Sequence, residues 1–124
     1  MTIRKEHLEF HQIGLETGWR TPPGYPLEIE QKILAGALDE IAKTGNRTRL
    51  LRFSAGACTT QPFLHDYWEE VYLLSGDLVV GDETSGLVLE NFSANTYACR
   101  PPGVYHGPFR SSTGCLLLEI HYYD

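Results

Sequence analysis

From Leu27 onward the sequence is a succession of short segments with β-type patterns, separated by turn residues, and it contains no convincing long helix. We expect strands over residues 28–34, 48–53, 60–78 (one or two strands meeting near Pro62), 78–81, 87–92, 95–99 and 115–122. Turns are expected at residues 43–47, 54–57, 75–77, 82–86 and 101–103. Many short strands at such spacing predict an all-β barrel or sandwich.

The first 28 residues do not share this pattern. Leu8, Phe10 and Ile13 are candidates for a short strand, and the run Thr21-Pro-Pro-Gly-Tyr-Pro26 excludes a helix. We therefore expect an N-terminal arm over residues 1–28 and a single barrel over residues 29–124. Apolar arm residues and uncovered edge strands would fit a homodimer, because pairing covers strand edges.

Composition narrows the class of protein. A chain of 124 residues fits one domain. Its net charge of −6 and its lack of a basic stripe argue against a nucleic-acid partner. No apolar run approaches the roughly 20 residues of a membrane-spanning helix. The N-terminus does not resemble a signal peptide, and the odd number of widely spaced cysteines favours a reduced, cytoplasmic protein. We expect each cysteine to be a small buried residue.

Residues 60–78 place ionisable side chains in an apolar strand pattern. In a regular strand His65 and Glu69 would point to the same side as Val71 and Leu73, while Glu70 would point outward. An unpaired charge is costly to bury, so a His and a Glu on an apolar face need a partner. A metal ion is the most economical one.

A third candidate ligand is His106, which follows the rigid turn Pro101-Pro-Gly103. Imidazole and carboxylate together make a mixed nitrogen and oxygen site. Two histidines and one carboxylate also leave positions open for water, substrate or dioxygen. That pattern is typical of non-haem Fe(II) enzymes, although Zn, Mn, Ni or Co would fit it as well.

The two motifs resemble those of the cupin superfamily, and the flanking sequence resembles its small ChrR-like members. The first motif is matched by Gly56, His65, Glu69 and Gly76, and the second by Pro101, Gly103 and His106. Asn95 stands where a Gly usually precedes the second motif, and Arg110 stands where an Asn usually ends it. The resemblance implies a single-domain, RmlC-like double-stranded β-helix, or jelly-roll barrel, over roughly Ile29 to Tyr122.

The sequence departs from the first motif at Phe63, where the family has its first His. Three readings are open. His65, Glu69 and His106 bind a metal as a three-ligand set, or another residue substitutes, or metal binding is lost. Gln61 has the right parity to substitute, and His121 and His11 are candidates from elsewhere in the chain. The parity of His121, shared with Glu119 and not with Leu118, favours an outward position.

The resemblance implies a small-molecule enzyme that uses Fe(II) or Zn. Similar small cupins include dioxygenases that cleave diketones and hydroxyketones. Tyr97 and Tyr105 are then candidate hydrogen-bond donors to a substrate oxygen, and Arg100 or Arg52 would neutralise an anionic substrate. A Zn-binding or ligand-sensing module and a metal-free lyase-like or cyclase-like pocket are the alternatives.

Overall fold

The computed structural model describes residues 5–81 and 89–124. Within these ranges the secondary structure consists of strands alone. They are β1 (Ile29–Asp39), β2 (Thr44–Phe53), β3 (Trp68–Val80), β4 (Glu90–Ser93), β5 (Thr96–Arg100), β6 (Phe109–Arg110) and β7 (Cys115–Tyr122). The predicted all-β class is confirmed.

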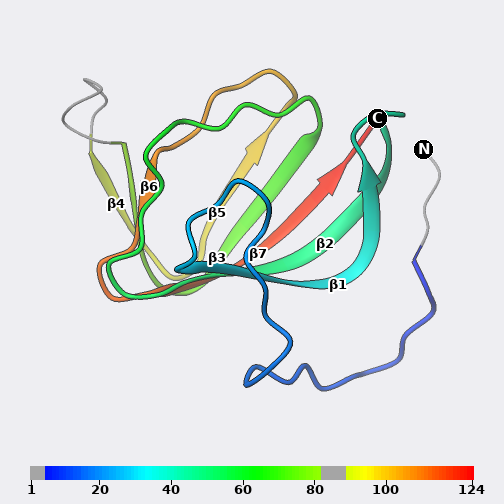
Figure 1. Cartoon of the computed structure of the whole chain (residues 1–124), viewed down its shortest axis with the longest axis horizontal. Helices are drawn as coiled ribbons and strands as arrows, with labels where there is room; N and C mark the ends of the chain where they lie inside the picture. Colours follow the sequence, from blue (N-terminus) through cyan, green and yellow to red (C-terminus); the bar gives the residue numbers. More distant parts are fainter. Residues whose placement is uncertain (1–4, 82–88) are drawn as a thin grey trace.

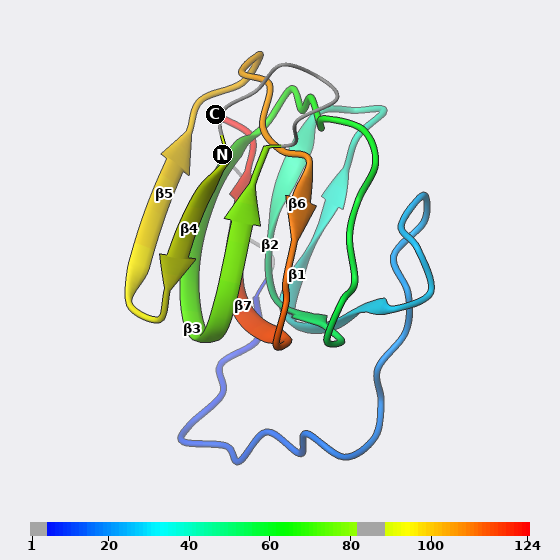
Figure 2. The ribbon, with the colours of Figure 1, turned by 90° about the vertical axis from the view of Figure 1, so that its left-hand side faces the viewer.

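All strand pairs are antiparallel. The order β1-β2-β7-β3-β4 forms one path, and β5 and β6 also pair with β3. In Figure 2, β3 to β6 lie beside and in front of β1 and β2, so that the strands curl around a common interior. The first half of β3 pairs with β7 and β5, and its second half pairs with β4 and β6. This long strand therefore links the two sides of the barrel (Figure 1).

The predicted turn at residues 75–77 is wrong. β3 continues through Ser75, Gly76 and Asp77, and its register against β7 shifts between Leu73 and Ser75. Gly76 has a φ of 82°, and a Cβ there would lie 1.9 Å from the carbonyl oxygen of Gly114. The Gly is thus required by a β-bulge with a close backbone approach, and this bulge bends the strand.

Other strand and turn boundaries differ from the predicted ones by a few residues. The first hairpin turns at residues 40–43, so Gly45 and Asn46 lie inside β2 and not in the expected turn at 43–47. β5 begins one residue later than expected, and β6 was not predicted. Asn95 has a φ of 69°, in keeping with a position usually held by Gly. The expected loop at residues 82–86 lies outside the described residues.

The interior has an apolar end and a polar end. Inward positions on β2, β3 and β7 alternate with outward ones, as strand geometry requires. The apolar end contains Ile29, Leu51, Phe53, Ala57, Val71, Leu73, Leu78, Cys115 and Leu117. Towards the other end the same strands present charged residues and histidines inward, which places a polar cluster directly above the hydrophobic core.

The arm preceding β1 follows the outside of the barrel (Figure 1). Trp19 packs there against Arg52, whose guanidinium carbon lies 4.0 Å from the centroid of the Trp19 ring. No strand forms around Phe10, which is fully exposed. The described residues include no helix of a length and hydrophobicity that would span a membrane. Cys115 is buried in the core, but Cys58 and Cys99 are exposed, so the burial expected for all three is correct for one.

Candidate metal centre

A row of four polar residues crosses the inner face of the barrel. The strand registers place Arg47 opposite His121, His121 opposite Glu69, and Glu69 opposite Arg100. Hydrogen bonds follow the same order. Arg47 donates to Nδ1 of His121 at 2.8 Å, Nε2 of His121 lies 2.8 Å from Oε2 of Glu69, and Arg100 donates to Oε1 of Glu69 at 3.0 Å. We call these four residues the polar row.

A second set of polar side chains lies two residues further along β2 and β7, nearer the hydrophobic core. Arg49 donates to Glu119 at 2.8 Å from Nε, and its NH2 group lies 2.7 Å from the same oxygen. It also donates to Gln31 and to the hydroxyl of Tyr25. Burial disfavours the charge on Arg49, but the Glu119 carboxylate outweighs it and raises the pKa of the guanidinium group. Burial raises the pKa of Tyr25 to about 12, so its hydroxyl stays protonated.

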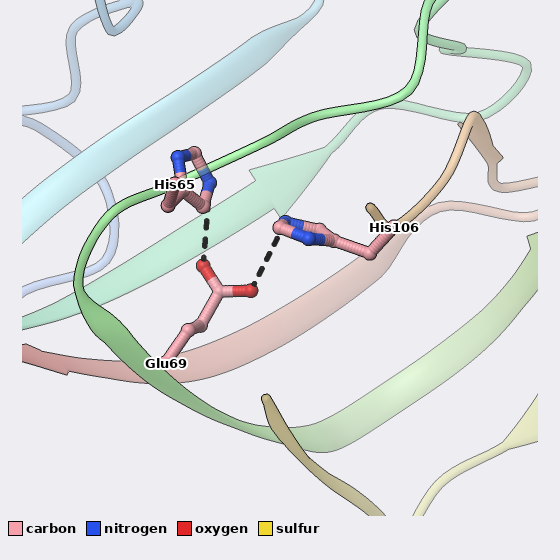
Figure 3. A group of neighbouring side chains, drawn as sticks. All are labelled: His65, Glu69 and His106. Carbon is pink, nitrogen blue, oxygen red and sulfur yellow. Dashed lines mark ion pairs between the residues drawn. The ribbon is translucent and has the colours of Figure 1, made fainter. Parts of the chain in front are cut away.

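His65 reaches Glu69 from a loop and not from a strand. β3 begins at Trp68, so the parity argument that placed both residues on one regular strand is wrong for His65 and correct for Glu69. The loop nevertheless turns the His65 ring inward, with Nε2 3.9 Å from Oε2 of Glu69 (Figure 3). The ring stacks on Tyr67, with centroids 4.6 Å apart.

His106 approaches the other oxygen of the same carboxylate, and its ring lies beside that of His65, with centroids 4.8 Å apart. Its backbone N–H donates to the carbonyl oxygen of Phe63, and the N–H of Phe63 donates in return, which fixes the segment after the predicted turn at 101–103. Nε2 of His106 lies 3.4 Å from Oε1 of Glu69 (Figure 3). The structure thus brings together the three metal ligands that the sequence suggested, His65, Glu69 and His106.

Hydrogen-bond partners assign the tautomers of two of these histidines. Nδ1 of His106 contacts the carbonyl oxygen of Val104, which accepts only, so Nδ1 carries the proton and Nε2 keeps its lone pair facing Glu69. His121 is the reverse case. A guanidinium group has no acceptor, so Nδ1 of His121 accepts from Arg47, and Nε2 carries the proton that it donates to Glu69.

The outward position expected for His121 is therefore wrong. Its side chain is fully buried, and Glu119 and Leu117 on the same face of β7 are buried as well. Among the described residues, Glu69, Glu119 and His121 also lie close enough together to hold an ion. In this arrangement the lone pair of His121 is directed at Arg47, so His121 would bind an ion through Nε2 only in its other tautomer, which gives up the hydrogen bond from Arg47. His121 instead fixes the carboxylate of Glu69.

Glu69 is ionised, and its free lone pairs face the two other ligands. Burial raises the pKa of this carboxyl group, but the hydrogen bond from His121 and the surrounding positive charge outweigh burial and lower the pKa to about 2. Each carboxylate oxygen has two lone pairs and accepts one hydrogen bond from the polar row. The remaining lone pairs, together with the imidazole nitrogens 3.4 and 3.9 Å away, form a donor set suited to a divalent ion.

The histidines predict a pH dependence of stability. Burial lowers the pKa of His65 to about 4 and also lowers that of His106. Between pH 6.5 and 4 the unfolded chain therefore binds more protons than the folded chain, and the free energy of unfolding falls as the pH falls. We expect metal-free protein to lose about 2 kcal/mol between pH 7 and 4.5.

Urea denaturation at each pH measures this loss. The His65→Gln variant is the control, because it lacks one of the two groups and should show a shallower slope. A free energy of unfolding that stays constant from pH 7 to 4.5 would contradict the neutral, buried state of these rings.

The remaining candidates lie outside the cluster. Gln61 is exposed in the loop before Phe63, and His11 is exposed in the arm. Tyr105 is 70% exposed, and Tyr97 is 56% exposed and donates to Glu70 at 2.6 Å. Neither tyrosine belongs to the polar row, and the catalytic role expected for them stays a prediction, as does a fourth ligand from Gln61.

Sequence reasoning missed several residues of the site. Arg47 and Arg49 alternate with outward positions and continue the inward face of Leu51 and Phe53. This alternation between inward and outward residues could have predicted that Arg47 and Arg49 point into the barrel. Arg52 was named with Arg100 as an anion-binding candidate, but it pairs with Glu30 on the outside of the barrel. Arg100, in contrast, belongs to the polar row.

Below the ligand set, the barrel interior contains a small cavity of about 30 Å³. Its walls include Glu69, Arg100 and His106 at one end and Leu51 and Leu117 at the other. Phe63 also lines it, with its ring 6.0 Å from that of His65 and 5.9 Å from that of His106, measured between centroids. The position of the usual first ligand is thus filled by an aromatic ring beside both histidines.

No protein-family model and no curated protein sequence matches the chain. Solved structures do match it. An RmlC-like cupin from Shewanella frigidimarina NCIMB 400 has 18% identity and a TM-score of 0.67, and the match covers 98% of this chain and 95% of that one. An acetylacetone dioxygenase from Acinetobacter johnsonii has 17% identity, a TM-score of 0.65 and coverage of 95% and 77%. A polyketide cyclase from Streptomyces resistomycificus has 15% identity, a TM-score of 0.67 and coverage of 94% and 81%.

Identities this low establish a shared architecture and not a shared activity. The architecture agrees with the glycine positions of the two sequence motifs, since Gly76 lies at the bulge of β3 and Gly103 at the turn before His106. The chain has the RmlC-like cupin fold.

Proposed function

We propose that this cupin is a metal-dependent enzyme whose ligands are His65, Glu69 and His106. The observation that carries the proposal is the donor set itself. An ionised, buried carboxylate faces two imidazole Nε2 atoms at 3.4 and 3.9 Å. These separations are too long for good hydrogen bonds. They are close to the roughly 3.3 Å that separates ligands placed tetrahedrally about 2.0 Å from one ion.

A bound divalent ion, Fe(II) or Zn, would act as a Lewis acid on a carbonyl or enolate oxygen of the substrate, and Fe(II) would also support chemistry with dioxygen. The chain's own residues hold the ligands in place. Arg100 and His121 fix the two oxygens of Glu69, and the carbonyl of Val104 fixes the His106 ring. Such supporting contacts orient metal ligands and strengthen metal affinity.

Within this class we propose a dioxygenase that acts on a diketone or hydroxyketone. Two observations support it. Three protein ligands leave positions open on the metal, and Arg100 provides a positive charge beside them for an enolate. An acetylacetone dioxygenase is among the proteins of similar fold.

Oxygen uptake by Fe(II)-loaded protein tests this proposal. Acetylacetone, benzoylacetone and 2-hydroxyacetophenone should be supplied in turn, with Zn-loaded protein as the control that binds substrate without consuming oxygen. Oxygen uptake with one of these substrates is the expected result. Full metal loading without uptake for any of them would reject the dioxygenase and leave metal binding intact. Absence of bound Fe, Zn, Mn and Ni at micromolar concentration would reject the proposal as a whole.

Restoring the missing ligand should strengthen metal binding. The Phe63 ring lies next to both His65 and His106. A His at this position would face the same ion and add a fourth ligand. We therefore expect Phe63→His to lower the dissociation constant for Zn by about tenfold or more, since an added ligand contributes on the order of 1 kcal/mol or more of binding free energy. Competition with a chelating dye measures this constant. Phe63→Leu is the control, because it removes the ring and adds no ligand. Equal affinities for all three proteins would contradict the three-ligand site.

A metal-free pocket is the second candidate, and Phe63 is the observation that favours it. Its ring stacks against Tyr25 at 5.0 Å between centroids and occupies the place of a ligand. In that case His65 and Glu69 would act as a coupled acid and base, in a lyase-like or cyclase-like reaction. Activity that persists after complete removal of metal would favour this candidate.

Three finer expectations belong to the same proposal. The protein would belong to the ChrR-like group, lie in the cytoplasm and form a homodimer. Each copy would act on a small-molecule substrate. A Zn-binding or ligand-sensing role is the alternative within that group. Sedimentation of the full chain measures the oligomeric state directly.

A further inference from the structure

A second cavity adjoins the candidate metal centre; it shares part of its lining with the cavity described above and is the larger of the two. It lies between β3, β4 and β5 and has a volume of about 200 Å³. An engineered cavity of about 150 Å³ is enough to bind benzene in another protein. The walls are mainly apolar and include Leu73, Val80, Phe92 and Ala98. The cavity is therefore large enough for an aromatic ring or a branched alkyl group.

Arg100 links this cavity to the candidate metal centre. Its side chain lines both cavities, and one of its nitrogens donates to Glu69 at 3.0 Å. A guanidinium group has five N–H donors in a planar fork, so one bond to Glu69 leaves donors for a second acceptor. Glu90 also lines the larger cavity, but it pairs with Val80 at the far end of β3. The two ends of the cavity thus differ in charge, with the positive end next to the metal ligands.

The charge of the buried cluster also favours an anion. Arg49 and Arg100 pair with the carboxylates of Glu119 and Glu69, and Arg47, which donates to the imidazole of His121, adds one positive charge beyond these two pairs. The chain as a whole carries a net charge of −6. A bound divalent ion would increase the local excess further. Uncompensated positive charge in a poorly solvated site attracts an anionic ligand.

We propose that the enzyme binds a small amphiphilic anion, with an apolar ring or alkyl body in the cavity between β3, β4 and β5 and its negatively charged oxygens on Arg100. This assignment rests on the proposed function, since it places the reacting oxygens next to His65, Glu69 and His106. The shared chemistry is a pair of oxygens that carry one negative charge, and both a carboxylate and the enolate of a diketone provide it.

Binding to the full chain as purified tests the assignment. Two probes are used: 3-phenylpropanoate represents a carboxylate, and benzoylacetone, at a pH where its enolate predominates, represents a diketone. Isothermal titration calorimetry measures the binding of each. Two comparison probes separate the two ends of the ligand. 3-Phenylpropan-1-ol keeps the ring without the charge, and propanoate keeps the charge without the ring. Each comparison probe should bind about tenfold or more weakly than 3-phenylpropanoate, because it lacks one contribution.

Two variants on one strand locate the apolar body. Ala98 lines the larger cavity, and Cys99 is exposed on the other face of β5. We expect Ala98→Leu to weaken binding of 3-phenylpropanoate by about tenfold or more, because it fills the cavity. Cys99→Leu adds similar bulk outside and should leave binding unchanged. Arg100→Gln should weaken binding of the anion by about tenfold and affect the alcohol much less.

The outcomes are distinct from those for metal binding, which is measured on the same samples. Binding of the carboxylate, the enolate or both, lost in Ala98→Leu while the metal content stays normal, supports the assignment and identifies the anion. Failure of both anions to bind a protein that retains its metal overturns it and leaves the proposed metal-binding site in place. Equal effects of Ala98→Leu and Cys99→Leu also overturn it. Anion binding by a protein that takes up no metal supports the cavity and rejects the metal-dependent reaction.

Discussion

The His106→Ala variant is expected to bind no metal at micromolar concentration. The reason is that His106 is one of the three proposed ligands among the described residues, and the tautomer set by the carbonyl of Val104 directs its Nε2 lone pair at the position beside Glu69. The Phe63 ring offers no replacement. Metal content after loading and desalting, with thermal unfolding to show that the variant is folded, provides the measurement.

His121→Ala is the matched control, since His121 contacts the same carboxylate without offering a lone pair to the ion. Removing a residue that orients a ligand typically weakens metal affinity by about 10- to 100-fold without abolishing binding. The two variants should therefore differ clearly. Full retention of metal by His106→Ala, or complete loss by His121→Ala with normal folding, would show that the ligand set has been assigned to the wrong histidine.

The Glu119→Ala variant is expected to lose about 3–5 kcal/mol of folding stability. Its carboxylate neutralises Arg49, whose side chain is only 3% exposed. Without Glu119 the guanidinium charge stays buried, and its remaining hydrogen-bond partners among the described residues are the neutral groups of Gln31 and Tyr25. Urea denaturation near neutral pH measures the loss. Glu30→Ala breaks the more exposed pair with Arg52 and should cost about 1 kcal/mol or less.

A double variant distinguishes lost charge pairing from lost packing. Arg49→Met combined with Glu119→Leu removes both charges and keeps most of the volume, so it should recover most of the stability lost in Glu119→Ala. If the double variant is as unstable as Glu119→Ala, the defect arises from packing. A loss below about 1 kcal/mol in Glu119→Ala would mean that Arg49 finds water or another partner.

Local sequence patterns predicted most of the strands, and the three candidate ligands that they suggested lie close together in the structure. Residues 48–53 and 115–122 are rich in apolar residues and are bounded by turn residues, and the turn at 101–103 is marked by Pro-Pro-Gly. His65 was placed correctly beside Glu69 although it lies in a loop and not in the strand that the argument assumed. The motif spacing carried that result, because the fold brings the loop before β3 onto its inner face.

The bulge at Gly76 shows why other features were missed. Ser75-Gly76-Asp77 has the composition of a turn, and a prediction from the neighbouring residues alone depends on that composition. The structure extends β3 through it because Gly114 and Cys115 of a distant segment approach the backbone closely, and only Gly permits that contact. Such long-range pairing leaves no signature in the residues nearby.

The polar row also decides which face of β7 is the inner one. Leu116, Leu118 and Ile120 on one face are about as apolar as Cys115 and Leu117 on the other, so hydrophobic burial alone nearly permits either orientation. A slip of one residue would exchange the two faces. It would also separate His121 from Arg47 and Glu69, and leave Arg49 without Glu119. The buried charges and hydrogen bonds therefore give the last strand a single register, and the groups that fix the candidate metal ligands also select the fold against its nearest alternative.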